Sequence, residues 1–360
     1  MNTEVTPANG TSQNTTLTHS DIWFKDGNIV LIAGSFAFKV HSGQLERHSE
    51  FFAGMFDVPQ PSEQDMIDGC LYVEMLDSPD DLYHFLSALY DGLYFSFPRP
   101  LHFARLAAVS RLSTKYIVPH LLQQCLERLK LDWPSTLGGW DAREDEALSP
   151  KGSYSPRQFT PHPVLVIDLA IELGLNDILP SAFYDLARYG PSKIMYGTPG
   201  IRSILVSPNQ DPRFVCLSNQ LLVRTLQGRE LGQQFLINFL ASHLETRQPS
   251  PGCWYRSSSD PGKPHLCVQG FHQMYIDIYR CIGGVAIGRD ADPLFTLSQG
   301  MERLKRPDKI EGERVRALMC GPCKVEFLSD CAKGRETAWE LIPEWFGLVE
   351  EPKEGDEYDD

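Results

Sequence analysis

The amino-acid sequence predicts an α+β fold, in which a small mixed sheet covered by helices precedes an all-helical region. Short alternating apolar runs, typical of strands, are confined to the first 75 residues. Beyond them, apolar residues recur at helical spacing between turns that contain Pro or Gly. We therefore expect five segments: a disordered tail (1–20), an α/β domain (21–131), an exposed linker (132–161), a helical region (162–347) and an acidic disordered tail (348–360).

The predicted strands open the α/β domain. Apolar runs at 22–24 and 29–32 flank Lys25-Asp26-Gly27-Asn28, a turn-forming tetrapeptide, and this pattern predicts a hairpin. The alternation of Phe36, Phe38 and Val40 predicts a third strand that leads directly into a helix starting near residue 44. A further strand is expected over 70–75, after a polar loop.

The helix that follows has distinct boundary signals. Ser78 can cap it, Pro79 fits the first helical position, and Asp80 and Asp81 suit the positive end of the helix dipole. Gly92 can end it. Two more helices are expected over 101–112 and 118–131. Together they form a helix, a short turn and a second helix entered through Pro, and the same arrangement recurs around residues 173–183.

The C-terminal half reads as helices separated by loops. Loops are expected at 197–212 and 248–264, and one long helix or two over 217–244, capped by Ser218. The remainder should be helical as far as Gly347. An acidic tail follows, and its composition is typical of disorder.

Several residues of the first domain form a set that occurs together in one known family. They are Asp21-Ile22-Trp23-Phe24, Phe38-Lys39-Val40-His41, Leu45, Ser49, Phe52, Met55, Phe56, Asp77-Ser78-Pro79, Leu82, Phe85, Leu89-Tyr90-Asp91-Gly92, Leu106-Ala107-Ala108, Leu112, Leu122, Cys125 and Leu129. With them, residues 21–130 resemble a BTB/POZ domain. The segment 179–184 and the region 320–348 resemble the BTB-domain proteins of mushroom-forming fungi. The chain has neither Kelch repeats nor tandem zinc fingers of the Cys₂His₂ type.

The resemblance implies a protein-interaction module. Such domains commonly homodimerise, partly by exchanging the first strand, and some dock a cullin-type ubiquitin-ligase scaffold. Ile22, Trp23, Phe24 and Phe52 are therefore candidate interface residues, although core packing is an alternative for these large apolar side chains. His41, at the strand-to-helix junction, is expected to have a structural role.

The cysteines suggest a second kind of site. Nine cysteines in a chain that opens without a secretory signal favour reduced thiols or metal ligands over a disulfide framework. Cys320 and Cys323 form a C-x-x-C pair that could bind one structural zinc together with Cys253 and Cys267. His265 and Cys331 are possible substitutes, and buried free cysteines are the alternative. The remaining cysteines, expected in the core, are Cys70, Cys125, Cys216 and Cys281.

The C-x-x-C pair has a second interpretation. Cys320-Gly321-Pro322-Cys323 matches the redox motif of thioredoxin, which requires a preceding strand and most of a βαβ domain after it. Residues 314–319 instead read as helix, and the sequence after the motif is too short and too helical for that fold. A metal ligand pair is therefore preferred to a redox dithiol.

Composition excludes several classes of function. A formal net charge of −14 and the absence of a Lys/Arg run argue against nucleic-acid binding. No apolar run approaches the roughly 20 residues that span a bilayer, so we expect a cytoplasmic or nuclear protein. The sequence has no Gly-rich phosphate loop, nucleophile elbow or His-Glu-x-x-His motif, so we do not expect an enzyme.

These observations together predict an interaction adaptor. It would homodimerise through its BTB-like domain and bring protein clients to a cullin-type ubiquitin ligase. The alternative is a structural or transcription-linked oligomerisation scaffold that has no part in a ligase. Zinc is the cofactor expected, if there is one.

Overall fold

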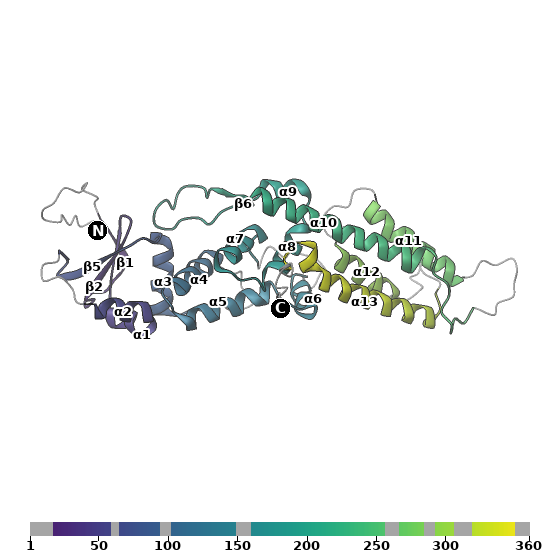
Figure 1. The fold of residues 1–360 in the computed structure, drawn as a ribbon, viewed down its shortest axis with the longest axis horizontal. Helices are drawn as coiled ribbons and strands as arrows, with labels where there is room; N and C mark the ends of the chain where they lie inside the picture. The colour runs from purple at the N-terminus through teal and green to yellow at the C-terminus, as the bar shows by residue number, and fades with distance from the viewer. Residues whose placement is uncertain are drawn as a thin grey trace, which may run out of the picture.

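The computed structural model describes residues 17–58, 65–93, 102–148, 160–255, 266–283, 292–305 and 319–349. The molecule is elongated, with a small sheet at one end and a group of long helices at the other (Figure 1). Of the predicted tails at 1–20 and 348–360, residues 1–16 and 350–360 lie outside the described residues. No helix in the described ranges has the length and apolarity needed to cross a membrane.

The sheet has five strands in the order β1-β3-β2-β5-β4. Their bounds are β1 (Thr18–Trp23), β2 (Ile29–Ala33), β3 (Phe36–Val40), β4 (Met66–Ile67) and β5 (Cys70–Met75). The predicted hairpin of the first two strands is wrong, because β1 pairs with β3 in parallel and it is β2 and β3 that form the antiparallel pair. The turn between β2 and β3 contains Gly34, whose φ of 54° favours glycine. Because β1 starts at Thr18, the ordered chain begins earlier than the predicted boundary at residue 21.

The two faces of the sheet have different surroundings. Leu31, Phe38 and Val40 on one face join the main hydrophobic core, which the helices complete. Val30 and Ile32 on the other face belong to a small separate cluster, whose other members are Ala37 and Ile67, with half-buried Leu17, Trp23, Cys70 and Tyr72 at its margin. The alternation of side chains along a strand separates these two sets.

Five helices follow or interrupt the strands of this unit. They are α1 (Ser42–His48), α2 (Glu50–Asp57), α3 (Pro79–Asp91), α4 (Phe103–Lys115) and α5 (Pro119–Asp132). The structure confirms that α3 begins at Pro79 and ends before Gly92. Asp80 does more than favour the helix dipole: its Oδ1 accepts the backbone N–H groups of Ile204 at 2.9 Å and Leu205 at 2.8 Å. The predicted loop after residue 196 therefore reaches back to the start of α3.

His84 on α3 gives the fold a dependence on pH. Burial, together with His102 and Arg105, lowers the pKa of His84 to about 4. In the unfolded chain the imidazole takes up a proton near its usual pKa of about 6.5. Since the unfolded state binds more protons between these values, stability is lost as the pH falls through this window, by up to about 3 kcal/mol.

We expect His84→Leu to remove this part of the pH dependence. The measurement is the urea midpoint of the variant minus that of the original protein, taken at pH 7 and at pH 4.5. This difference should be more favourable to the variant at pH 4.5 than at pH 7. His272→Leu changes an exposed histidine and is the matched control. Its urea midpoint should differ from that of the original protein by the same amount at pH 7 and at pH 4.5. An equal difference for His84→Leu at the two pH values would contradict the assignment.

The predicted linker at 132–161 is wrong over residues 132–148. This segment forms α6 (Leu137–Glu146), and Trp133 and Trp140 are among the largest fully buried side chains of the protein. The Thr136 hydroxyl caps the helix by accepting the N–H of Gly139. Residues 149–159 lie outside the described part of the chain.

Helices make up most of the described residues of the C-terminal region. Its elements are α7 (Pro163–Leu173), α8 (Leu179–Ala187), α9 (Pro191–Tyr196), the short strands β6 (Thr198–Pro199) and β7 (Phe214–Val215), α10 (Asn219–Leu240), a π-helix (Ala241–Glu245), α11 (Leu266–Gly283), α12 (Pro293–Lys305) and α13 (Gly321–Trp345). As expected, the Ser218 hydroxyl caps α10, where it accepts the N–H of Leu221. α7 packs on α4, so the second helix pair extends the first.

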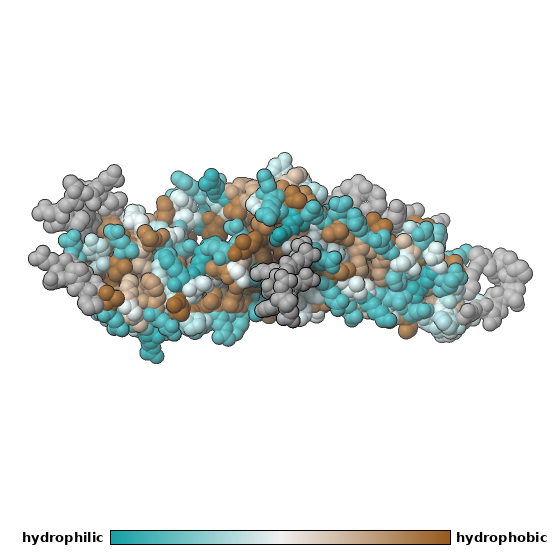
Figure 2. All heavy atoms as spheres, viewed as in Figure 1, coloured by the Kyte–Doolittle hydropathy of each residue, from teal (hydrophilic) through white to brown (hydrophobic). Residues whose placement is uncertain are grey.

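Two cores lie along the length of the molecule. The main core runs without a break from Ile29 in the sheet to Phe346 at the end of α13, across the predicted domain boundary. A second core surrounds the cysteines at the start of α11 and α13. On the face shown in Figure 2, polar and apolar residues are interspersed over the helices.

Candidate metal centre

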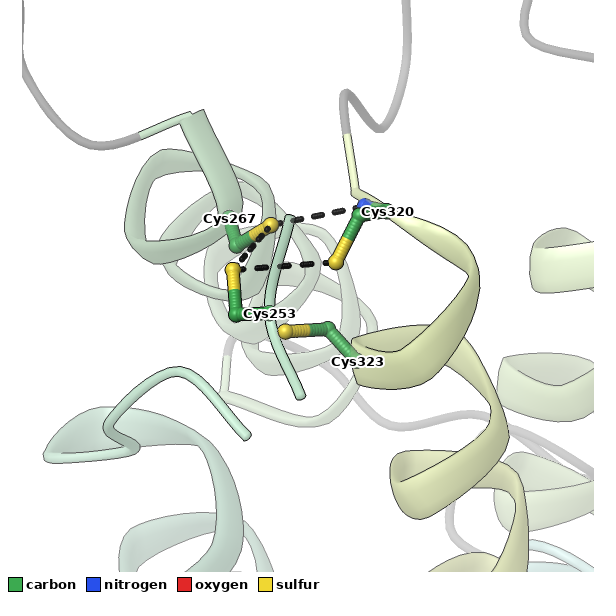
Figure 3. A group of neighbouring side chains, drawn as sticks. All are labelled: Cys253, Cys267, Cys320 and Cys323. Atoms are coloured by element: carbon green, nitrogen blue, oxygen red, sulfur yellow. Dashed lines mark hydrogen bonds between the residues drawn. The ribbon is translucent and has the colours of Figure 1, made fainter. Parts of the chain in front are cut away.

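Four cysteines from three separate segments meet at the end of the molecule far from the sheet (Figures 1 and 3). Cys253 lies in the irregular segment after the π-helix, and Cys267 is the second residue of α11. Cys320 is the N-cap of α13, and Cys323 lies in its first turn. Pro322 sits in this first turn, where its missing N–H costs no helical hydrogen bond. The structure thus brings together the four residues that the sequence nominated.

The sulfur atoms have the spacing of ligands around one ion. The Cys253 Sγ lies 3.6 Å from the Sγ of Cys267 and 3.6 Å from the Sγ of Cys320. All four sulfur atoms lie within 4.8 Å of one another. A tetrahedron with metal–sulfur bonds of about 2.3 Å has edges of about 3.8 Å, whereas a disulfide bond is about 2.05 Å long. The four thiols could therefore hold a metal ion between them.

The group is closed off from solvent. Cys253 is 7% exposed, Cys320 is 2% exposed, and Cys267 and Cys323 are fully buried. Apolar residues from the surrounding helices pack around it, including Phe271, Met274 and Phe327. A site with four buried protein ligands leaves no position for a substrate, so the arrangement suits a structural ion and not a catalytic one.

Backbone N–H groups are directed at the sulfurs. The N–H of Cys320 donates to the Sγ of Cys267, with the two atoms 3.4 Å apart. The N–H of Ser250 donates to the Sγ of Cys323 at 3.4 Å, and the hydroxyl of Ser250 lies 3.3 Å from the same sulfur. Such donors stabilise the negative charge that a thiolate ligand carries.

The thiols differ in acidity. Burial raises the pKa of Cys253 and of Cys267, because a thiolate is poorly solvated there. Burial also opposes ionisation of Cys320, but the backbone N–H groups of Cys323 and Trp254, with the neighbouring thiols, outweigh it and lower the pKa of Cys320 to about 7. A bound cation would replace the remaining thiol protons.

The substitute ligands do not enter the site. Cys331 is buried further along α13 but is not one of the four grouped cysteines, and burial raises its pKa to about 12. His265 lies outside the described residues. Among the cysteines expected in the core, Cys125 is buried and Cys70 is half-buried, but Cys216 is exposed and that prediction is wrong. The side chain of Cys281 is not described.

The C-x-x-C pair lies at a helix N-terminus, which sequence reasoning did not anticipate. The helix expected over 314–319 falls largely outside the described residues, since only Met319 is described. α13 starts immediately after Cys320. The presence of Cys253 and Cys267 beside the pair distinguishes it from an isolated dithiol.

Sequence reasoning missed a buried network of charges near the middle of the molecule. Arg143 of α6 lies 2.7 Å from Asp185 of α8. Arg188, just after α8, lies 2.8 Å from Glu144 and 2.8 Å from Asp292. All five side chains are at most 13% exposed. Arg143 and Glu144 lie in the predicted exposed linker at 132–161, and the signal of burial there is the pair of tryptophans at 133 and 140, which are buried.

The aromatic ring of Trp140 supports this network. The guanidinium of Arg143 lies 4.7 Å from the Trp140 ring centroid and that of Arg188 lies 5.2 Å from it. The hydroxyl of Tyr184 donates to Asp292. Burial and the charge of Asp292 raise the pKa of Tyr184 well above its usual value. The network joins α6 and α8 to the residue preceding α12.

The candidate interface residues occupy different environments. Phe52 is fully buried between Phe56 and Tyr116, so its predicted interface role is wrong and the core alternative holds. Ile22 and Phe24 are half-buried against the main core. Trp23 alone lies on the opposite face of the sheet, where its ring stacks on His19 with centroids 3.7 Å apart. His41 has a structural setting, with its backbone N–H donating to the Tyr90 hydroxyl at 3.0 Å.

No protein-family model matches the chain, and no curated protein matches it.

Proposed function

We propose that this chain is a protein-interaction adaptor that homodimerises through its N-terminal sheet. The observation that carries the proposal is that β1 is an edge strand of the sheet and ends in the half-buried Trp23. An edge strand offers unpaired N–H and C=O groups to another chain. The resemblance of residues 21–130 to BTB/POZ domains points in the same direction.

The apolar residues around Trp23 favour this surface for dimerisation. Val30 and Ile32 lie under it and are already buried, whereas Trp23 and Tyr72 are half-buried at its margin. Partly exposed aromatic residues are frequent anchors of interfaces. A second copy of the same surface would bury what remains exposed of these two rings.

We expect Trp23→Ala to weaken the dimer. Loss of an aromatic anchor costs about 2 kcal/mol or more, so the dimer Kd should rise at least about thirtyfold. Sedimentation equilibrium of the full chain measures it. Trp254→Ala, which removes an exposed tryptophan far from the sheet, is the matched control and should leave Kd unchanged. A wild-type chain that is monomeric at tens of micromolar would contradict the proposal.

The adaptor is proposed to bring clients to a cullin-type ubiquitin ligase, with the sheet unit contacting the scaffold and the helical region selecting the client. Binding of the full chain to a purified cullin N-terminal domain, measured by calorimetry, tests this step. A dissociation constant in the micromolar range or tighter supports it. Absence of binding at that concentration, with the dimer intact, would contradict the ligase role and favour an oligomerisation scaffold.

We further propose that Cys253, Cys267, Cys320 and Cys323 hold one structural zinc ion. Four sulfur ligands at tetrahedral separation suit zinc, which has no redox chemistry of its own and favours thiolates. The ion would join the segment containing Cys253 to the first turns of α11 and α13. These segments share the second core, and the ion would add a cross-link between them.

A further inference from the structure

Cys253 differs from the other three thiols of the metal centre. It lies outside any helix, next to Trp254 and Tyr255, which are 71% and 36% exposed. It is also the most exposed of the four cysteines and the one whose sulfur lies 3.6 Å from two others. As the most exposed of the four, Cys253 is the residue that we expect a small solute to meet first. Figure 3 shows the sulfur of Cys320 beside its own.

The geometry favours Cys320 over Cys267 as the second thiol. A disulfide requires the sulfurs to close from 3.6 Å to about 2.05 Å. Cys320 has an extended backbone, with φ −71° and ψ 161°, and precedes the regular part of α13, so its backbone can adjust. Cys267 lies within α11. Cys323 lies within the first turn of α13, where Ser250 holds its sulfur.

We propose that Cys253 and Cys320 form an oxidative modification site that releases the metal. The inference rests on the proposed zinc ion and names hydrogen peroxide as the oxidant. The Cys253 sulfur attacks the peroxide, the O–O bond breaks, and a sulfenic acid forms with loss of water. The Cys320 sulfur then displaces the hydroxyl group as a second water. Two sulfurs lose two electrons, the peroxide gains them, and the released Zn²⁺ leaves Cys267 and Cys323 to take up protons.

The product would change which segments are joined. The disulfide keeps the segment containing Cys253 attached to α13, while Cys267 at the start of α11 loses its link to both. α11 packs on the π-helix and on α12. Oxidation would therefore free one end of α11 and leave the remainder of the fold in place.

The test uses the full zinc-loaded chain and hydrogen peroxide. Zinc release is followed with a chromogenic chelator, and the disulfide is located by peptide mapping without reduction. We expect one zinc per chain to be released and the Cys253–Cys320 linkage to form. A Cys320–Cys323 or Cys253–Cys267 linkage would overturn the assignment.

Two ligand-conserving variants sharpen the result. Cys253→His keeps a zinc ligand but removes the reacting sulfur, so zinc release by peroxide should slow at least about tenfold. Cys331→Ala keeps all four ligands, removes a buried thiol outside the group, and should release zinc at close to the original rate. If both variants release zinc equally fast, the inference fails. Lack of zinc before peroxide is added contradicts the proposed metal site, whereas zinc that survives peroxide contradicts only this inference.

Discussion

The purified chain is expected to contain one zinc ion, and Cys323→Ser is expected to lose it together with much of the stability of the C-terminal helices. Cys323 is fully buried and belongs to the second core, so its loss leaves three thiols and a poorly solvated hydroxyl in place of a closed site. We expect a loss of about 3–5 kcal/mol. At about 2–4 °C per kcal/mol, the melting temperature should fall by roughly 10 °C.

Metal analysis and thermal unfolding, each with and without a strong chelator, provide the measurement. Cys331→Ala is the matched control, because it removes another buried thiol of α13 that is not among the four. It should keep the zinc, and chelator should lower its melting temperature as much as that of the original chain. Full stability of Cys323→Ser in chelator, equal to that of the untreated original chain, would contradict the metal site.

The second large effect is expected at the buried charge network. Arg188→Leu would remove the cation that contacts Glu144, Asp185 and Asp292. Arg143 would remain beside Glu144 and Asp185, but Asp292 would lose its ion pair. Removing one partner of a buried ion pair costs about 3–5 kcal/mol, because the remaining charge stays poorly solvated. Urea unfolding at pH 7 should show this loss as a lower midpoint.

An exposed ion pair of the same chemistry gives the control. Arg202 lies 3.2 Å from Asp211, but their side chains are 56% and 98% exposed. Arg202→Leu should change stability by less than about 0.5 kcal/mol. If the two substitutions have equal effects, the buried network does not contribute as its geometry implies.

Local signals were sufficient to predict some elements. α3 was predictable because Pro79, two acidic residues and Gly92 all act within the helix itself. The strand that pairs with β1 was not predictable from local signals. Whether β1 pairs with β3 or with β2 depends on the path of the backbone beyond the local turn. A turn-forming tetrapeptide between two apolar runs allowed a hairpin that the fold does not use.

α6 shows a different limit. Its sequence contains Gly138 and Gly139 and many charges, so its intrinsic helix propensity is low. The helix is held by burial of Trp140 and by the ion pairs of Arg143 and Glu144 with residues over 40 positions away. Local sequence patterns do not reveal partners so distant in the chain, and they therefore predict a linker for this segment.

All four members of the cysteine group were predictable, because few chemistries use grouped cysteines. The C-x-x-C pair indicated two ligands, and the Pro-rich segment that contains Cys253 indicated a region in need of a cross-link. Cys216 was misplaced because its apolar neighbours suggested burial, whereas its thiol is exposed and donates to the carbonyl of Tyr196 at 3.4 Å.

The unbroken main core also determines how the protein can be dissected. Val164 and Ile167 of α7 are fully buried in the same core as the side chains of the sheet unit, and α7 packs on α4. A fragment that stopped at residue 131 would uncover this apolar contact and remove the two buried tryptophans that follow. The same core continues beyond α8, where Phe183 stacks on Phe346 near the end of α13. A fragment that ended after α8 would uncover it too, so studies of dimerisation are best done on the intact chain.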